Sequence, residues 1–193
     1  MNPAINIREK YTYADYLNWP DDERWELIDG YPYAMSPAPV RKHQDILLQL
    51  ARKISDFFDD SSCRVYVAPF DVRLAEDYSD DHLINNVVQP DISVFCNKGS
   101  LDDKGAMGPP TLAVEILSPS TAQKDVKTKL LLYQKYEVEE YWIVDPVAET
   151  VEILILDDTG KYNPGEVFSE KLSSSRFEDL SIDLKGLFNK IRD

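Results

Sequence analysis

The chain has 193 residues, and charge is the unusual feature of its composition. Hydrophobic residues make up 43% and charged residues 29%, which is ordinary globular usage and excludes disordered and collagen-like classes. Against 35 acidic residues stand 21 lysines and arginines, so the net charge is −14. This balance argues against a general nucleic-acid coat protein or an anionic-membrane binder, because both need an excess of Lys and Arg. A nucleic-acid enzyme with its positive charge confined to one cleft is still compatible with it.

The cysteines and the N-terminus bear on the cellular compartment. Cys63 and Cys96 each lie in an apolar run, where a reduced, buried thiol is the usual state, and two cysteines are too few for a disulfide framework. A zinc site would need both to converge with His43 and His82, and we do not expect one. Residues 1–10 lack the apolar segment of a signal peptide, and no apolar run approaches a membrane span. We therefore expect a cytoplasmic protein.

In chain order, the first part of the sequence predicts two helices and a hairpin. Thr12 is a plausible N-cap, Asp29-Gly30 is typical of a type I′ turn, and hydrophobic residues recur along one stripe between Ile46 and Phe58. The predicted elements are a helix over residues 12–19, a hairpin with strands at 25–28 and 31–35, a loop at 36–39 and a helix over 41–58.

The remainder is richer in strands. The strands are predicted at residues 64–74 (interrupted at Pro69), 87–96, 111–117, 140–144 and 151–156, the helices at 121–136 and 180–191, and the loops at 76–81 and 97–110. No segment has the composition of a linker, so we expect one domain over residues 1–193. Three strands, a helix and a further strand in succession predict an α/β fold with a mixed sheet covered by helices.

Two carboxylates lie in apolar segments where strands are predicted. Asp91 lies in the run 87–95 and Glu115 in the run 112–117. Asp and Glu are almost never fully buried unless they are paired or bind a metal. The alternative is that each alternates onto a solvated sheet face or pairs with a buried Arg or Lys. We favour a functional site, because two such residues fall in neighbouring predicted strands.

Lys129 is a third polar residue in an apolar environment. It lies on the face of its predicted helix that Val126, Leu130 and Tyr133 define. The alternative is a lysine whose stem packs on the core while its ammonium reaches water. In the functional interpretation, the ammonium points over the carboxyl ends of the adjacent strands, close to Asp91 and Glu115.

These residue types together suit phosphodiester hydrolysis. Two carboxylates and a backbone carbonyl suit Mg²⁺ or Mn²⁺, which prefer oxygen ligands. A bound ion polarises a phosphoryl oxygen and lowers the pKa of its water, while a lysine stabilises the developing negative charge or holds the attacking water. Such a site needs no covalent intermediate.

Several long sequence strings also resemble a known family. They are Trp25-Glu26-Leu27-Ile28-Asp29-Gly30, Met35-Ser36-Pro37, His43-Gln44, Pro90-Asp91, Val114-Glu115-Ile116-Leu117-Ser118-Pro119-Ser120-Thr121, Asp125, Lys129-Leu130 with Tyr133, and Glu140-Tyr141-Trp142-Ile143-Val144-Asp145-Pro146. From about residue 13 to about residue 187, the chain resembles the Uma2 family. This family was formerly a domain of unknown function and is described as restriction endonucleases of the PD-(D/E)XK superfamily.

The resemblance implies a restriction-endonuclease-like α/β core, with a mixed sheet flanked by helices and extra hairpins at both ends. It implies that Asp91, Glu115 and the backbone carbonyl of Ile116 bind Mg²⁺ or Mn²⁺ and that Lys129 assists catalysis. The superfamily pattern places a lysine two residues after the Glu, where this chain has Leu117. In the Uma2 variant the lysine moves to the following helix, and Lys129 occupies that place.

The resemblance also implies two further site residues, Glu26 as an additional acid and His43 as an accessory group. Alternatively, Glu26 is an ordinary surface residue beside the turn, and His43 is simply a residue at the N-terminus of a helix. One departure is Glu137, which stands before Val138 where the family usually has Gly. The resemblance therefore leaves the geometry of that turn open.

Local charge favours a nucleic-acid partner more than the net charge does. Over residues 121–135 four lysines outweigh Asp125, and Arg41-Lys42-His43 adds a second basic spot. Such a cleft attracts phosphate, and we expect weak, salt-dependent binding of nucleic acid, with DNA favoured, and no membrane binding. By analogy with related nucleases we expect a homodimer, with the strand at 151–156 as an available edge. The alternatives are an inactive domain that binds nucleic acid or protein, and an enzyme acting on another phosphorylated substrate.

Overall fold

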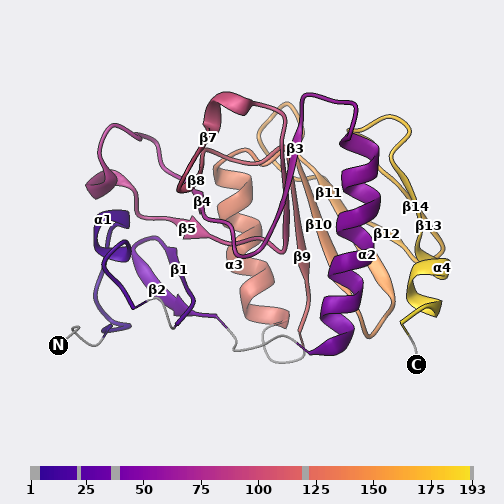
Figure 1. The fold of residues 1–193 in the computed structure, drawn as a ribbon, viewed down its shortest axis with the longest axis horizontal. Coiled ribbons are helices and arrows are strands. Elements are labelled where there is room, and N and C mark those ends of the chain that lie inside the picture. Colours follow the sequence, from indigo (N-terminus) through magenta and orange to yellow (C-terminus); the bar gives the residue numbers. More distant parts are fainter. Residues whose placement is uncertain (1–4, 21–22, 36–39, 119–121, 192–193) are drawn as a thin grey trace.

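The computed structural model describes residues 5–20, 23–35, 40–118 and 122–191, and for residues 122–125 only the backbone. Within these residues the chain forms a mixed α+β fold with two six-stranded sheets and four α-helices (Figure 1). The N-terminal hairpin and the C-terminal strands lie at opposite ends of the molecule.

The central sheet carries the middle and the C-terminal part of the chain. Its neighbouring strands are antiparallel except for β9 and β10, a parallel pair connected through α3. The strand order is β12 (Glu166–Phe168), β11 (Thr150–Ile155), β10 (Glu140–Asp145), β9 (Leu112–Ile116), β6 (Ile92–Phe95) and β3 (Arg64–Val67). Because β11 is paired on both sides, it is not the free edge that we expected for a dimer.

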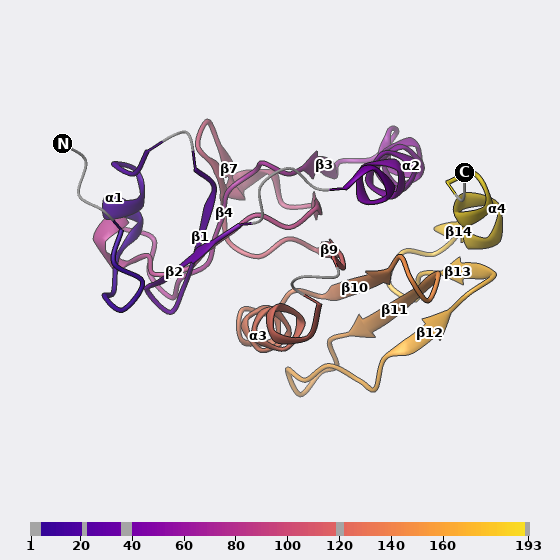
Figure 2. The ribbon, with the colours of Figure 1, turned by 90° about the horizontal axis from the view of Figure 1, so that it is seen from below.

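Helices cover both faces of the central sheet. Alternation along β9 and β10 sends Val114 and Trp142 to the face that packs against α2 (Arg41–Phe58), and Ala113 and Tyr141 to the face that packs against α3 (Ala122–Lys135). Figure 2 shows the two helices on opposite sides of these strands. None of the helices in the described part of the chain has the length and hydropathy that crossing a membrane requires.

The second sheet forms the N-terminal side of the molecule. Tyr13, in the short helix α1 (Tyr13–Tyr16), packs against Leu27 of this sheet. The strand order is β2 (Tyr31–Ala34), β1 (Trp25–Ile28), β5 (Val87–Val88), β4 (Val72–Arg73), β8 (Gly105–Met107) and β7 (Leu101–Asp102). The chain passes between this sheet and the central sheet repeatedly, from β3 to β4, from β5 to β6, from β6 to β7 and from β8 to β9.

The structure confirms the elements with the strongest local signals. The long helix spans Arg41–Phe58, as predicted, and the N-terminal hairpin has its turn at Asp29 and Gly30. Their φ angles are 50° and 83°, and positive φ at both central residues is what a type I′ turn requires. Glu137 has a φ of 61° and thus adopts the left-handed conformation usual for the glycine that it replaces. The predicted loop at residues 36–39 lies outside the described residues.

Prolines divide two of the predicted strands: the interruption predicted at Pro69 is confirmed, whereas the single strand predicted over residues 87–96 is wrong. Residues 64–74 form β3 and β4, separated around Pro69, and residues 87–96 form β5 and β6, separated around Pro90. Proline lacks the N–H that a sheet ladder needs, so the strand stops and the chain passes into the other sheet.

Other helices and loops differ from the prediction in their extent. The helix predicted over residues 12–19 is only α1, and the predicted loop at 97–110 contains β7 and β8. The helix predicted over residues 180–191 begins as a strand, β14 (Ser181–Asp183), which pairs with the preceding β13 (Lys171–Ser173), and only α4 (Leu184–Asn189) is helical.

The two cysteines form a disulfide, which corrects the expectation of reduced thiols. Arg64 of β3 pairs with Phe95 of the antiparallel β6, so Cys63 and Cys96 face each other one position beyond the ladder. The register of β3 against β6 brings them together, and that register is not visible in the local sequence.

Candidate active site

Asp91 and Glu115 meet where two central strands are joined. β6 and β9 are antiparallel, with Ile92 opposite Val114. Asp91, immediately before β6, therefore lies beside the carboxyl end of β9, and its Oδ2 accepts a hydrogen bond from the Ile116 N–H at 2.7 Å. The site thus lies at the carboxyl end of β9 and the amino end of β6, rather than at two carboxyl ends as we expected.

Lys129 of α3 reaches these carboxylates from the helix that covers them. Its side chain is buried, and Nζ lies 2.8 Å from Glu115 Oε1. Alternation along β9 places Glu115 on the same face as Ala113, which packs against α3. The ammonium is therefore directed into the site and does not extend to solvent.

Glu26 joins the same cluster from the second sheet. Its Oε1 lies 2.8 Å from Lys129 Nζ and accepts the Gln89 backbone N–H at 2.8 Å. The neighbouring Ile28 lies in the hydrophobic cluster that contains residues of α3. This face of β1 therefore turns towards α3, and Glu26 is buried instead of lying on the surface beside the turn.

Tyr133 also belongs to the site, although we did not predict a role for it from the sequence. Its hydroxyl donates a hydrogen bond to Glu115 Oε1 at 2.7 Å, and its side chain is fully buried. The sequence placed Tyr133 on the apolar face of the helix. Its spacing of four residues from Lys129 is the signal that both side chains reach the same point.

His43, near the start of α2, approaches Asp91 from the opposite side of the sheet. Its Nε2 lies 3.3 Å from Asp91 Oδ2, and its Nδ1 is buried without a hydrogen-bond partner among the described residues. Burial lowers the pKa of His43, but the hydrogen bond and charge of Asp91 outweigh it and raise the pKa above its ordinary value of 6.5. A hydrogen bond to the Ile116 backbone acts in the same direction.

The cluster carries more negative than positive charge. Burial raises the pKa of Glu115 above its ordinary value of 4.5, the Lys129 ammonium opposes this rise, and the Asp91 and Glu26 carboxylates add to it. Burial also raises the pKa of Tyr133, so its hydroxyl remains a donor. Glu26 and Glu115 share the Lys129 ammonium and Asp91 lies beside them, so the carboxylates outnumber the ammonium and a cation would balance the excess negative charge.

The donor atoms suit a hard divalent cation. The hydrogen bonds and ion pairs described above use Asp91 Oδ2 and Glu115 Oε1, and they do not use Asp91 Oδ1 or Glu115 Oε2. Two such oxygens and the adjacent Ile116 carbonyl fit the preference of Mg²⁺ or Mn²⁺ for a few protein oxygens completed by water. The described residues contain no group of three or more His, Cys, Asp or Glu side chains placed to hold a metal.

Some of the basic residues that we expected around the site form contacts with other groups. Arg41 pairs with Asp45 at 2.8 Å, and Lys42 donates to the Pro146 carbonyl at 2.6 Å. Lys127 is exposed on α3, and Lys135 lies 3.9 Å from Glu76. The Lys124 side chain lies outside the described part of the structure.

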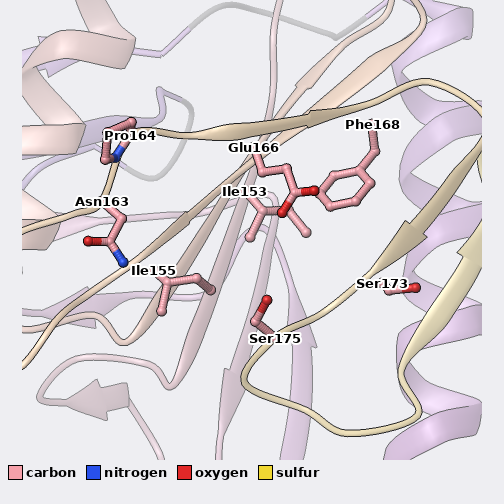
Figure 3. Close-up of a pocket in the computed structure, with 8 residues that line it drawn as sticks. All are labelled: Ile153, Ile155, Asn163, Pro164, Glu166, Phe168, Ser173 and Ser175. Atoms are coloured by element: carbon pink, nitrogen blue, oxygen red, sulfur yellow. The ribbon is translucent and has the colours of Figure 1, made fainter.

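A separate groove of about 270 Å³ lies on the other side of the central sheet (Figure 3). It contains none of the site residues. Its lining includes Ile153 and Phe168 of β11 and β12, with Ser173 and Ser175 of the C-terminal segment. Ile153 belongs to the core that contains α2, whereas Glu115 lies on the α3 face.

Three comparisons relate the chain to known proteins. The model of the Uma2 family, described as "Putative restriction endonuclease", matches residues 13–185. A protein of Synechocystis sp., "Uncharacterized protein slr1290", is 25% identical over 156 residues, which are 79% of this chain and 78% of that protein. A crystal structure from Anabaena variabilis, titled as a putative nuclease belonging to DUF820, has a similar fold: its TM-score is 0.75 at 22% identity, over 94% of this chain and 99% of that one.

Proposed function

Because the chain belongs to the Uma2 family, we propose that it is a metal-dependent endonuclease that hydrolyses phosphodiester bonds of nucleic acid, DNA being the favoured substrate. The observation that supports this most is the convergence of Asp91, Glu115 and Lys129 at one point between β6, β9 and α3. Lys129 is buried between two carboxylates, with a third nearby. Well-packed apolar side chains would stabilise the fold at least as well as such a charged cluster, so its presence indicates a functional role.

In this proposal Asp91, Glu115 and the Ile116 carbonyl would hold Mg²⁺ or Mn²⁺. An ion held there would polarise a phosphoryl oxygen and lower the pKa of a water molecule. Lys129 supplies positive charge where negative charge develops on the phosphoryl group. Because Glu115 and Glu26 raise the pKa of Lys129 despite its burial, the ammonium remains protonated and acts electrostatically rather than as a base.

Glu26 and His43 act through the other residues. Glu26 holds the Lys129 ammonium from the side opposite Glu115, with its own carboxylate fixed by the Gln89 N–H. His43 contacts the Asp91 oxygen that also accepts the Ile116 N–H. Both residues thus position the groups that carry the chemistry.

Cleavage of supercoiled plasmid in Mg²⁺ or Mn²⁺ tests the proposal. The wild-type chain should nick or linearise the plasmid, and EDTA or Asp91→Ala should abolish this activity. Glu178→Ala is the matched control, because Glu178 is an exposed carboxylate far along the chain from the site. Cleavage that persists in Asp91→Ala would refute the proposal.

The charge of −14 favours one alternative, a domain that keeps the fold but binds nucleic acid or protein without catalysis. Absence of Mn²⁺ binding in calorimetry would support this alternative. A third candidate, an enzyme on smaller phosphorylated compounds such as nucleotides, would hydrolyse small phosphodiesters and leave plasmid intact.

The proposal includes a homodimer, because one such site cuts one strand and cleavage of a duplex needs two. Sedimentation velocity of the wild-type chain should give a mass near twice that of the monomer. A monomeric mass in the presence of DNA and metal would remove this part of the proposal.

A further inference from the structure

We propose that Tyr133 is a positioning residue that fixes Glu115 so that only one of its carboxylate oxygens faces the cation. This inference rests on the metal site of the proposed function. It starts from the observation that two donors meet at a single atom: Tyr133 Oη lies 2.7 Å and Lys129 Nζ lies 2.8 Å from Glu115 Oε1. Neither of these two contacts involves Oε2.

Lys129 alone does not fix the carboxylate. Its ammonium is shared equally, because Glu26 Oε1 lies at the same distance of 2.8 Å as Glu115 Oε1. A lysine is a flexible point charge whose donors rotate freely. It therefore holds Glu115 near Glu26 without setting the orientation of the carboxylate plane.

Tyr133 supplies the rigidity that Lys129 lacks. Its ring is fully buried and packs edge to face against Tyr141, with the ring centroids 5.0 Å apart and an interplanar angle of 78°. A phenol held in this way presents its hydroxyl from one direction only. The hydrogen bond to Oε1 consequently leaves Oε2 as the oxygen that is available to the proposed cation.

Tyr141 provides a matched control within the same packing layer. It is also fully buried, but its hydroxyl has no hydrogen-bond partner among the described residues. Tyr133→Phe and Tyr141→Phe each remove one buried oxygen and keep the ring. The first removes a bond to the proposed metal ligand, whereas the second removes none of the bonds described for the site.

The experiment is calorimetric titration of Mn²⁺ into the wild-type chain and both variants, with folding checked by circular dichroism. Removal of a group that supports a metal ligand typically lowers metal affinity by about 10–100-fold, and we expect Tyr133→Phe to fall in this range. Tyr141→Phe should bind Mn²⁺ like the wild type. Equal affinities of the wild type and Tyr133→Phe would overturn the role of Tyr133 and leave the proposed function standing.

Testing Tyr133→Phe in a Glu115→Asp variant distinguishes a positioning role from a general loss of stability. Glu115→Asp keeps a carboxylate but draws it back from the Tyr133 hydroxyl, so Tyr133→Phe should then weaken Mn²⁺ binding little. An equal loss in both backgrounds would overturn the inference. No Mn²⁺ binding by the wild-type chain would overturn the metal site itself, together with the role of Tyr133.

Discussion

The Lys129 ammonium lies 2.8 Å from Glu26 Oε1, and this contact joins the two sheets of the molecule at the candidate active site. Glu26 belongs to β1 of the second sheet, whereas Lys129 lies on the helix that covers the central sheet. Both side chains are about nine-tenths buried. The site therefore depends on how the N-terminal hairpin packs against α3.

Lys129→Met should lose both activity and stability. Removing one partner from a buried charged cluster costs about 3–5 kcal/mol, because the Glu26 and Glu115 carboxylates are left without compensation. Plasmid cleavage should fall by about 100-fold or more, since the charge opposite the phosphoryl group is lost. Urea denaturation and the cleavage assay measure the two effects.

The control for this variant is Lys127→Met, which changes an exposed lysine on the same helix. It should leave the free energy of unfolding within about 0.5 kcal/mol of the wild type. A stable and fully active Lys129→Met would show that the ammonium is dispensable.

Glu26→Gln should separate catalysis from metal binding. Glu26 contacts Lys129 and the Gln89 N–H, and its described contacts do not include Asp91. We therefore expect cleavage to fall by about 10-fold or more while the Mn²⁺ affinity measured by calorimetry stays close to the wild-type value. A large loss of Mn²⁺ affinity would instead place Glu26 among the metal ligands. Glu178→Gln serves as the exposed control.

Glu140 should make the stability of the chain depend on pH. Its fully buried carboxylate accepts hydrogen bonds from Trp142 Nε1, the Ser174 hydroxyl and the Arg176 N–H. Burial nevertheless raises the pKa of Glu140 above its ordinary value of 4.5. The folded state then binds the proton more tightly than the unfolded state, so this group lowers stability as the pH rises from about 4.5 through the raised pKa.

Glu140→Gln removes that titration and keeps an acceptor oxygen. Between pH 4.5 and 8, the free energy of unfolding of the variant should decline less than that of the wild type. Chemical denaturation at several pH values provides the comparison. Parallel pH profiles for the two proteins would mean that Glu140 titrates alike in the folded and unfolded states.

Reduction of the Cys63–Cys96 disulfide should destabilise the fold without reaching the site. The two residues are 33 positions apart, and closing a loop of this length is worth about 3–4 kcal/mol in the unfolded chain. Urea denaturation with and without dithiothreitol should show a loss of this order. The stability of the double variant Cys63→Ser/Cys96→Ser should not change with the reductant. If the stability of the wild-type chain does not change either, the bond does not form in solution.

Local patterns in the sequence predict a large part of this fold. The stripe from Ile46 to Phe58 and the Asp29-Gly30 turn each depend on neighbours within a few residues, and both are confirmed. The single strand predicted over residues 87–96 was wrong, because the change from one sheet to the other at Pro90 depends on distant pairing partners. The Cys63–Cys96 bond was missed for the same reason.

The site shows a similar division between local and distant information. Asp91, Glu115 and Lys129 are recognisable as polar residues in apolar segments, and the structure brings them together. Tyr133 is not recognisable in this way, because a tyrosine on the apolar face of a helix is ordinary, and only its spacing of four residues from Lys129 points to the site. Only the tertiary structure shows that its hydroxyl ends at Glu115 Oε1.

Anomalous diffraction from crystals soaked in Mn²⁺ tests the central claim most directly. The account predicts one strong anomalous peak within coordination distance of both Asp91 and Glu115, with Glu115 bound through a single oxygen. It also predicts that Asp91→Ala crystals lack this peak. Strong Mn²⁺ peaks elsewhere, with none between these two carboxylates, would contradict the account.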